Sequence, residues 1–122
     1  MNDGLGLNPT QTWPVPRFMG KTRKAWLIVD GSASGLTILD QWPSGSFVSS
    51  GTGSYSTTYT PASGLFASQN ATMVRCSVSG NAFNCQARAT LNAGATQLTV
   101  ETYANSATPG SVGGPVYIEF WA

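Results

Sequence analysis

Short apolar runs that alternate with turn residues are the feature that most restricts how this chain can fold. From Lys24 onward, β-branched and aromatic runs are interrupted by glycine, proline, asparagine or aspartate, with about the 8–12-residue spacing of sandwiches and barrels. No segment keeps a helical period for about ten residues, so almost no helix is expected. The pattern predicts an all-β fold, a small antiparallel β-sandwich of about 7–8 strands.

The 122 residues fit one domain of ordinary size, which can bury a core without metals or several disulfides. Turn sequences such as Asp30-Gly31, Gly80-Asn81 and Pro109-Gly110 separate the runs. The expected strands are Lys24–Asp30, Leu36–Asp40, Ser46–Ser50, Ser54–Tyr59, Thr72–Ser79, Ala82–Leu91, Gln97–Tyr103 and Pro115–Trp121.

The first 22 residues differ from the rest, because they hold three of the seven prolines and scattered apolar side chains without a period. Proline fixes φ and removes a hydrogen-bond donor, so this stretch predicts an extended anchoring arm before a sandwich domain at 23–122. An apolar arm is expected to dock onto another virion chain or a neighbouring copy. The residues assigned to this docking are Trp13, Val15, Arg17, Phe18, Lys21 and Arg23.

Charge is scarce, at 9% of residues with a net charge of +1. Copies of the chain therefore meet little electrostatic repulsion, which favours self-association. Six basic residues are too few for a phosphate-binding surface, so no nucleic-acid partner is expected. Four of them, Arg17, Lys21, Arg23 and Lys24, cluster where the arm meets the domain. The cluster is either a solvated junction or, slightly favoured, a contact with an acidic patch on the docking partner.

The N-terminal sequence lacks the basic start and apolar run of a signal peptide, and no stretch approaches the ~20 apolar residues that span a bilayer. Synthesis in a bacterial cytoplasm, with no membrane partner, is therefore expected. Cysteines normally stay reduced in that compartment, so a disulfide needs a positional argument.

The segment around Gly80-Asn81 supplies such an argument. A two-residue hairpin loop there places Val78 opposite Phe83 and Cys76 opposite Cys85. Both pairs fall at non-hydrogen-bonded positions, where cross-strand side chains approach most closely. Two interpretations stay open for Cys76 and Cys85: a disulfide formed after release from the cell, or a reduced pair of small core residues.

The last strand, Pro115–Trp121, carries large side chains on both faces. Such a strand either lies inside the fold or presses against another subunit. Tyr117, Phe120 and Trp121 are accordingly candidate subunit-interface residues.

Catalytic chemistry is not expected. The chain has no histidine, the commonest general base and zinc ligand. Asp30 and Asp40 are the only acids close in sequence, and Asp30 is explained by the turn that it begins. A paired-carboxylate site would need these two in one cleft with a raised pKa on one. No catalytic residue, metal or cofactor is assigned.

A carbohydrate-binding module is the alternative from another functional class. Exposed Trp42, Tyr55, Tyr59 and Tyr103 would then stack on a host surface glycan. The competing interpretation is that these rings fill the sandwich core or a trimer axis. Exposure of two or more rings on one face would favour sugar binding.

Four segments in order, Arg23–Trp26, Asp30-Gly31, Phe47–Tyr55 and Tyr59–Ala62, resemble a domain of phage tail-fibre and virion appendage proteins. That family reads approximately K-A-W-V-x-F-[DN]-G-T-G, then V-S-S-x-x-x-x-G-T-G-x-Y-T, then F-T-x-A. Here Leu27-Ile28-Val29 replaces the usual V-x-F. The resemblance implies a β-rich domain that forms a homotrimer on a phage particle and has no catalytic residues.

The expected function is therefore that of a structural protein of a bacteriophage virion. It would be a homotrimeric tail fibre, tail appendage or head-fibre module anchored by its N-terminal arm, or alternatively a capsid decoration protein that stabilises the head. The expected partners are other copies of the chain and other tail or capsid proteins.

Overall fold

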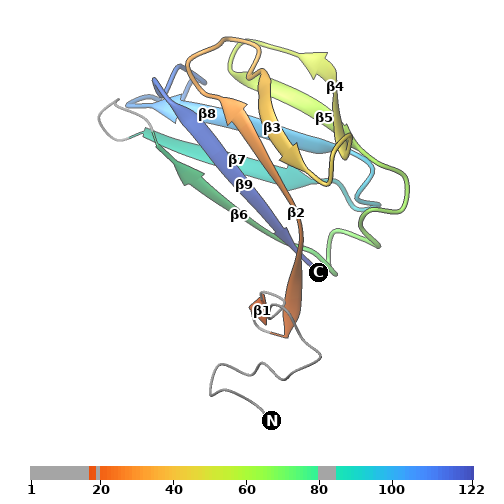
Figure 1. Cartoon of the computed structure of the whole chain (residues 1–122). Coiled ribbons are helices and arrows are strands. Elements are labelled where there is room, and N and C mark those ends of the chain that lie inside the picture. The colour runs from red at the N-terminus through yellow and green to blue at the C-terminus, as the bar shows by residue number, and fades with distance from the viewer. Residues whose placement is uncertain (1–16, 19, 80–84) are drawn as a thin grey trace.

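Two antiparallel β-sheets face each other in the computed structural model, which describes residues 17–18, 20–79 and 85–122 (Figure 1). The described residues contain no helix. The all-β sandwich predicted from the spacing of the apolar runs is therefore confirmed. Each expected strand has a counterpart within a few residues, and the last strand has the predicted bounds.

The sheets are built from strands of two to ten residues. The first sheet contains β1 (Arg17–Phe18), β2 (Lys21–Asp30), β3 (Ile38–Trp42), β6 (Met73–Val78) and β9 (Pro115–Trp121). The second contains β4 (Phe47–Thr52), β5 (Ser56–Pro61), β7 (Cys85–Leu91) and β8 (Leu98–Ala104). In the first sheet β9 lies between β2 and β6, and both β1 and β3 pair with β2. The order in the second sheet is β4-β5-β8-β7.

The core lies between the sheets, because alternate side chains of each strand point inward. In β9, Val116, Ile118 and Phe120 are fully buried. The Phe120 ring stacks on Phe47 and on Phe66, with ring centroids 5.0 Å apart in each case. These three rings connect β9, β4 and the segment after β5 across the middle of the sandwich.

The predicted hairpin around Gly80-Asn81 is wrong, because β6 and β7 belong to different sheets. β6 pairs with β9 and β7 pairs with β8. The loop itself lies outside the described residues. The apolar alternation is the same in both arrangements, but the two faces meet across the core instead of side by side. β9 and β8 each offer an unbroken ladder of six or seven paired residues, which a β6–β7 hairpin would have to displace.

The segment predicted as an extended arm is partly sheet. Lys21 and Thr22 begin β2, and the two residues of β1 pair with them. The backbone groups of Thr22 also exchange hydrogen bonds with Ala122, at 3.1 and 3.0 Å. Figure 1 shows the β1–β2 hairpin extending from the sandwich at the end where the C-terminus lies. Residues 1–16 of the expected arm lie outside the described residues.

A side chain connects the neighbouring edges of the two sheets. The Gln41 amide of β3 accepts a hydrogen bond from the Phe47 backbone N–H of β4 at 2.6 Å and donates one to the Phe47 carbonyl at 3.2 Å. Gln41 thus occupies the backbone positions that an added strand would use. β4 also has a register irregularity between Ser49 and Gly51. Both features limit strand addition at this edge.

Replacing Gln41 by alanine should lower the free energy of unfolding by about 1–3 kcal/mol, because two partly buried backbone groups lose their partners. Urea unfolding followed by tryptophan fluorescence measures the change. Gln97→Ala, at an exposed position, is the matched control and should change stability by less than about 0.5 kcal/mol.

Gln41→Glu refines this test. A carboxylate keeps the bond from the Phe47 N–H but repels the carbonyl, so the folded-state pKa of the new acid should rise above its unfolded value of about 4.3. Its stabilising contribution is then present below pH ~4.3 and is lost as the pH rises through the folded-state pKa. A stability difference from wild type that does not depend on pH would argue against the bridge.

Candidate interaction surface

The outer face of the first sheet presents a continuous row of large side chains. The ladder places Trp42 of β3 opposite Trp26 of β2, and Trp26 opposite Glu119 of β9. The Trp26 and Tyr117 rings lie 6.2 Å apart at a tilt of 45°. Because alternate residues of a strand share a face, the neighbouring row holds Ile28 and Tyr117. An aromatic surface therefore crosses three strands on this side of the sandwich.

Glu119 organises the polar part of this face. Its carboxylate lies 3.6 Å from Arg23 Nη1 and 4.0 Å from Arg75 Nη1. Arg23 also donates to the Tyr117 hydroxyl at 3.1 Å, and that hydroxyl donates to Glu119 at 3.4 Å. Burial, followed by the nearby Glu119 charge, raises the pKa of Tyr117. Opposite charges thus balance on the β2–β9–β6 part of the face.

The exposed apolar side chains lie on one side of the sandwich. Within the described residues, the large hydrophobic side chains left exposed are Leu39 (55%), Trp42 (50%) and Val48 (62%). Leu39 and Trp42 belong to β3 and Val48 to β4. Because Gln41 bonds the Phe47 backbone, these residues flank the bridge between β3 and β4. We call Leu39, Trp42 and Val48 the apolar edge.

Sequence reasoning missed this apolar edge. It placed the subunit interface on Tyr117, Phe120 and Trp121, and for two of them the structure corrects that assignment. Phe120 is fully buried in its own chain's core and Trp121 is 7% exposed, because β9 lies between β2 and β6 instead of at an edge. Tyr117 is half-buried on the outer face, where an interface role stays a prediction. An edge strand with an exposed leucine and tryptophan was the signal available in Ile38–Trp42.

The predicted docking residues fall into three groups. Trp13 and Val15 lie outside the described residues. Arg17 and Phe18 form β1. Lys21 and Arg23 are engaged within the chain, since Lys21 Nζ donates to the Ala71 carbonyl at 2.9 Å and Arg23 contacts Tyr117. Their contact with a partner chain stays a prediction.

The four aromatics considered for sugar stacking do not share a surface. Tyr59 is fully buried, and its hydroxyl donates to the Leu36 carbonyl; burial raises its pKa. Tyr55 packs against the core. Trp42 lies on the first sheet, whereas Tyr103 lies on the second, where the Arg88 guanidinium sits 5.9 Å from its ring centroid. For Tyr59, the prediction of an exposed ring is wrong.

The two neighbouring acids do not behave as a catalytic pair. The Asp30 carboxylate accepts bonds from the hydroxyl and backbone N–H of Ser32, and these bonds lower its pKa. A general acid requires a shift in the opposite direction. The turn role predicted for Asp30 is confirmed by these contacts. Among the described residues, no group of three histidine, cysteine or acidic side chains could hold a metal ion.

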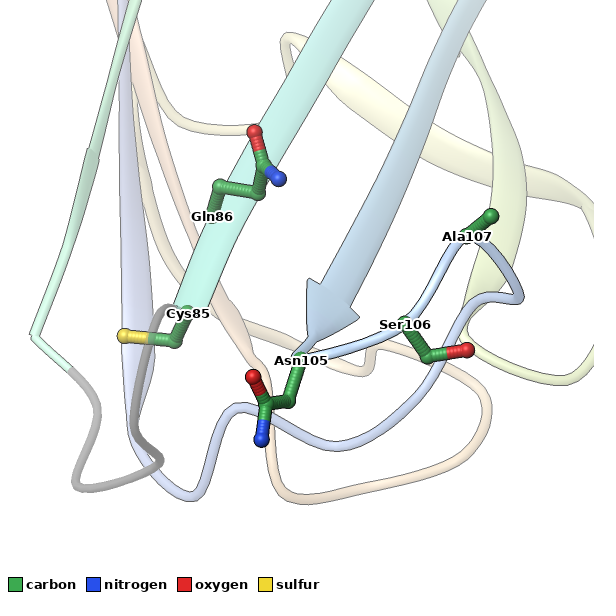
Figure 2. A pocket seen from close by; sticks show the side chains of 5 residues that line it. All are labelled: Cys85, Gln86, Asn105, Ser106 and Ala107. Carbon is green, nitrogen blue, oxygen red and sulfur yellow. The ribbon is translucent and has the colours of Figure 1, made fainter.

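A polar recess opens beside β7 and the segment after β8 (Figure 2). Cys85, Gln86, Asn105, Ser106 and Ala107 line it. Arg88 lines an adjoining recess that shares Gln86, Ser106 and Ala107. There Arg88 donates to Glu101 at 2.9 Å, and this bond lowers the pKa of Glu101. Arg88 already has carboxylate and aromatic partners, so the recess offers mainly amide and hydroxyl groups.

The two cysteines are free thiols, and the register that brought them together does not exist. The Cys76 thiol bonds the Ala89 backbone. Cys85 lies four residues from Ala89 along β7, which is about 13 Å at ~3.3 Å per residue. A disulfide needs Cα atoms within about 7 Å, so the observed arrangement does not place Cys76 and Cys85 for pairing. Both pack against the core, as the second interpretation expected.

Cys76 should react slowly with alkylating reagents. Burial raises the pKa of its thiol to about 11, against a smaller opposing effect of the Ala89 hydrogen bond. Because the thiolate is the reactive form, alkylation of Cys76 at pH 8 should be roughly 100-fold slower in the native protein than in urea. Iodoacetamide labelling of the Cys85→Ser variant, read by mass spectrometry, measures this rate. Equal rates in buffer and urea would contradict the burial of Cys76.

Comparisons with known proteins identify no relative. No family model, curated protein or solved structure matches this chain. In the described part of the chain, no helix is long and apolar enough to cross a membrane. Arguments about function therefore depend on the chain's own residues and on the motif resemblance in Arg23–Ala62.

Proposed function

We propose that this protein is a structural subunit of a bacteriophage particle that associates with copies of itself, as a homotrimer, and with other virion proteins through its N-terminal arm. Its role is one of assembly and attachment rather than catalysis. The single observation that supports this most strongly is the apolar edge, because a soluble β-sandwich that exposes a leucine, a tryptophan and a valine together has a surface suited to a protein contact.

Three further features support the proposal. The net charge of +1 leaves little repulsion between copies. The β1–β2 hairpin extends beyond the sandwich, so it carries residues 1–16 at the end of the molecule where the C-terminus lies. Finally, the motifs in Arg23–Ala62 resemble those of virion appendage domains. Within this proposal the subunit is a tail fibre or appendage, a head fibre, or a capsid decoration protein.

Immunogold labelling of intact particles tests the proposal. Serum raised against residues 24–122 should label purified virions of the phage that encodes the chain, and the same serum absorbed with the pure domain should not. Label on the tail assigns an appendage, and label over the head assigns a head fibre or decoration protein. Purified virions that contain no trace of the chain by labelling and by mass spectrometry would refute a structural role.

A further inference from the structure

The apolar edge offers side chains rather than backbone groups to a partner. Gln41 occupies the backbone N–H and carbonyl of Phe47, and the register irregularity in β4 follows two residues later. A partner strand therefore cannot extend the second sheet at Phe47. What stays available is the exposed surface of Leu39, Trp42 and Val48.

Charge around the apolar edge indicates what covers it. β3 and β4 together hold one charged residue, the exposed Asp40. On β2, Lys24 is also exposed and is the extra residue at a register irregularity between Arg23 and Ala25. A strongly charged partner would find little to pair with on these two edge strands. A copy of the same chain brings a similarly neutral apolar surface together with one lysine for the one aspartate.

Asp40 and Lys24 cannot pair within one chain. Asp40 lies opposite Ile28 in the β2–β3 ladder, and Lys24 precedes Ile28 by four residues, or about 13 Å along β2. An ion pair requires the charged atoms to approach within about 4 Å. The two charges lie on opposite sides of the Trp26–Trp42 pair along the strand direction, so each is free to meet the other on a neighbouring copy.

We infer that the apolar edge is covered by a second copy of this chain, with Asp40 of one copy facing Lys24 of the next. This inference rests on the self-association in the proposed function and names its surface. Because the pair joins two different residues, the contact is head-to-tail and can close into a ring of three. Leu39, Trp42 and Val48 supply the buried area, and the Asp40–Lys24 pair selects the orientation.

A charge exchange tests the contact. Sedimentation velocity and light scattering over a concentration series should show a trimer of the wild-type full chain. Asp40→Lys and Lys24→Asp should each weaken association at least about tenfold, because each places like charges together. The double variant should recover most of the wild-type affinity. Thr90→Lys, at an exposed position of the second sheet, is the control and should leave association unchanged.

A variant of the apolar edge separates this inference from the proposed function. Leu39→Ser combined with Val48→Ser should reduce the trimer to monomers while the unfolding transition stays cooperative. A wild-type chain that stays monomeric throughout the concentration series overturns the inference, and particle labelling then decides the virion role alone. A trimer insensitive to all of these variants overturns the assigned surface and leaves self-association standing.

Discussion

Replacing Phe120 by alanine is expected to lower the free energy of unfolding by about 3–5 kcal/mol, the loss typical of a large aromatic core residue. The Phe120 side chain is fully buried and stacks on Phe47 and Phe66. Removing it leaves a cavity between rings that belong to different parts of the chain. A loss of this size is a large fraction of the total stability of a small domain, so part of the Phe120→Ala protein should be unfolded at 37 °C. Urea unfolding at low protein concentration measures the change.

Two comparisons make the Phe120 result decisive. Phe120→Leu keeps most of the volume and should cost about 1–2 kcal/mol, whereas Leu39→Ala removes an exposed side chain and should cost less than about 0.5 kcal/mol. If Phe120→Ala instead changed the oligomeric state without lowering stability, Phe120 would be an interface residue, as the sequence alone suggested.

Replacing Gly31 by alanine is expected to cost about 2–3 kcal/mol, because a methyl group there overlaps atoms that cannot move away freely. A Cβ at Gly31 would lie 2.4 Å from Val112 Cγ2 and 2.5 Å from the Gly114 carbonyl oxygen. The backbone of Gly31 also donates to Gly114 and accepts from Val112, at 3.0 Å in both bonds. The clash therefore falls where the end of β2 is bonded to the segment before β9.

Gly94→Ala is the matched control for Gly31→Ala. A Cβ at Gly94 makes only ordinary contact with Thr96, at 3.8 Å, so the change in unfolding free energy should stay within about 0.5 kcal/mol. Urea midpoints of the two variants, compared at the same pH, give the result. A Gly31→Ala protein as stable as Gly94→Ala would show that Gly31 does not hold the contact between the end of β2 and the segment before β9.

The sequence predicted the strands well because their signal is local. Period-2 alternation assigned the inward faces of β2 and β9 correctly, and glycine, proline and Asx turns marked where strands end. The turn role of Asp30 followed from the same kind of reasoning, since Asp30 and Ser32 are two residues apart. Features that depend on neighbours within a few residues can therefore be predicted from the amino-acid order alone.

The candidate site could be predicted only in part. Trp42 was recognised as a ring that would be exposed, and it is half exposed. Trp26 was not considered for the site, although the ladder places it directly opposite Trp42. Tyr59 has the same local character as Trp42 but lies in the core, because β5 pairs on both sides with β4 and β8. Exposure depends on a strand's place in the sheet, which alternation does not encode.

By itself, the sequence determined the all-β class, the strand positions, the inward and outward faces and the low charge that permits copies to approach each other. Only the tertiary structure decided which strands are neighbours. It placed β9 at the centre of its sheet, separated Cys76 from Cys85 and left β3 and β4 as adjacent edges. The physical reason is that alternation repeats over two residues, whereas partner choice compares ladders formed by residues far apart in the chain.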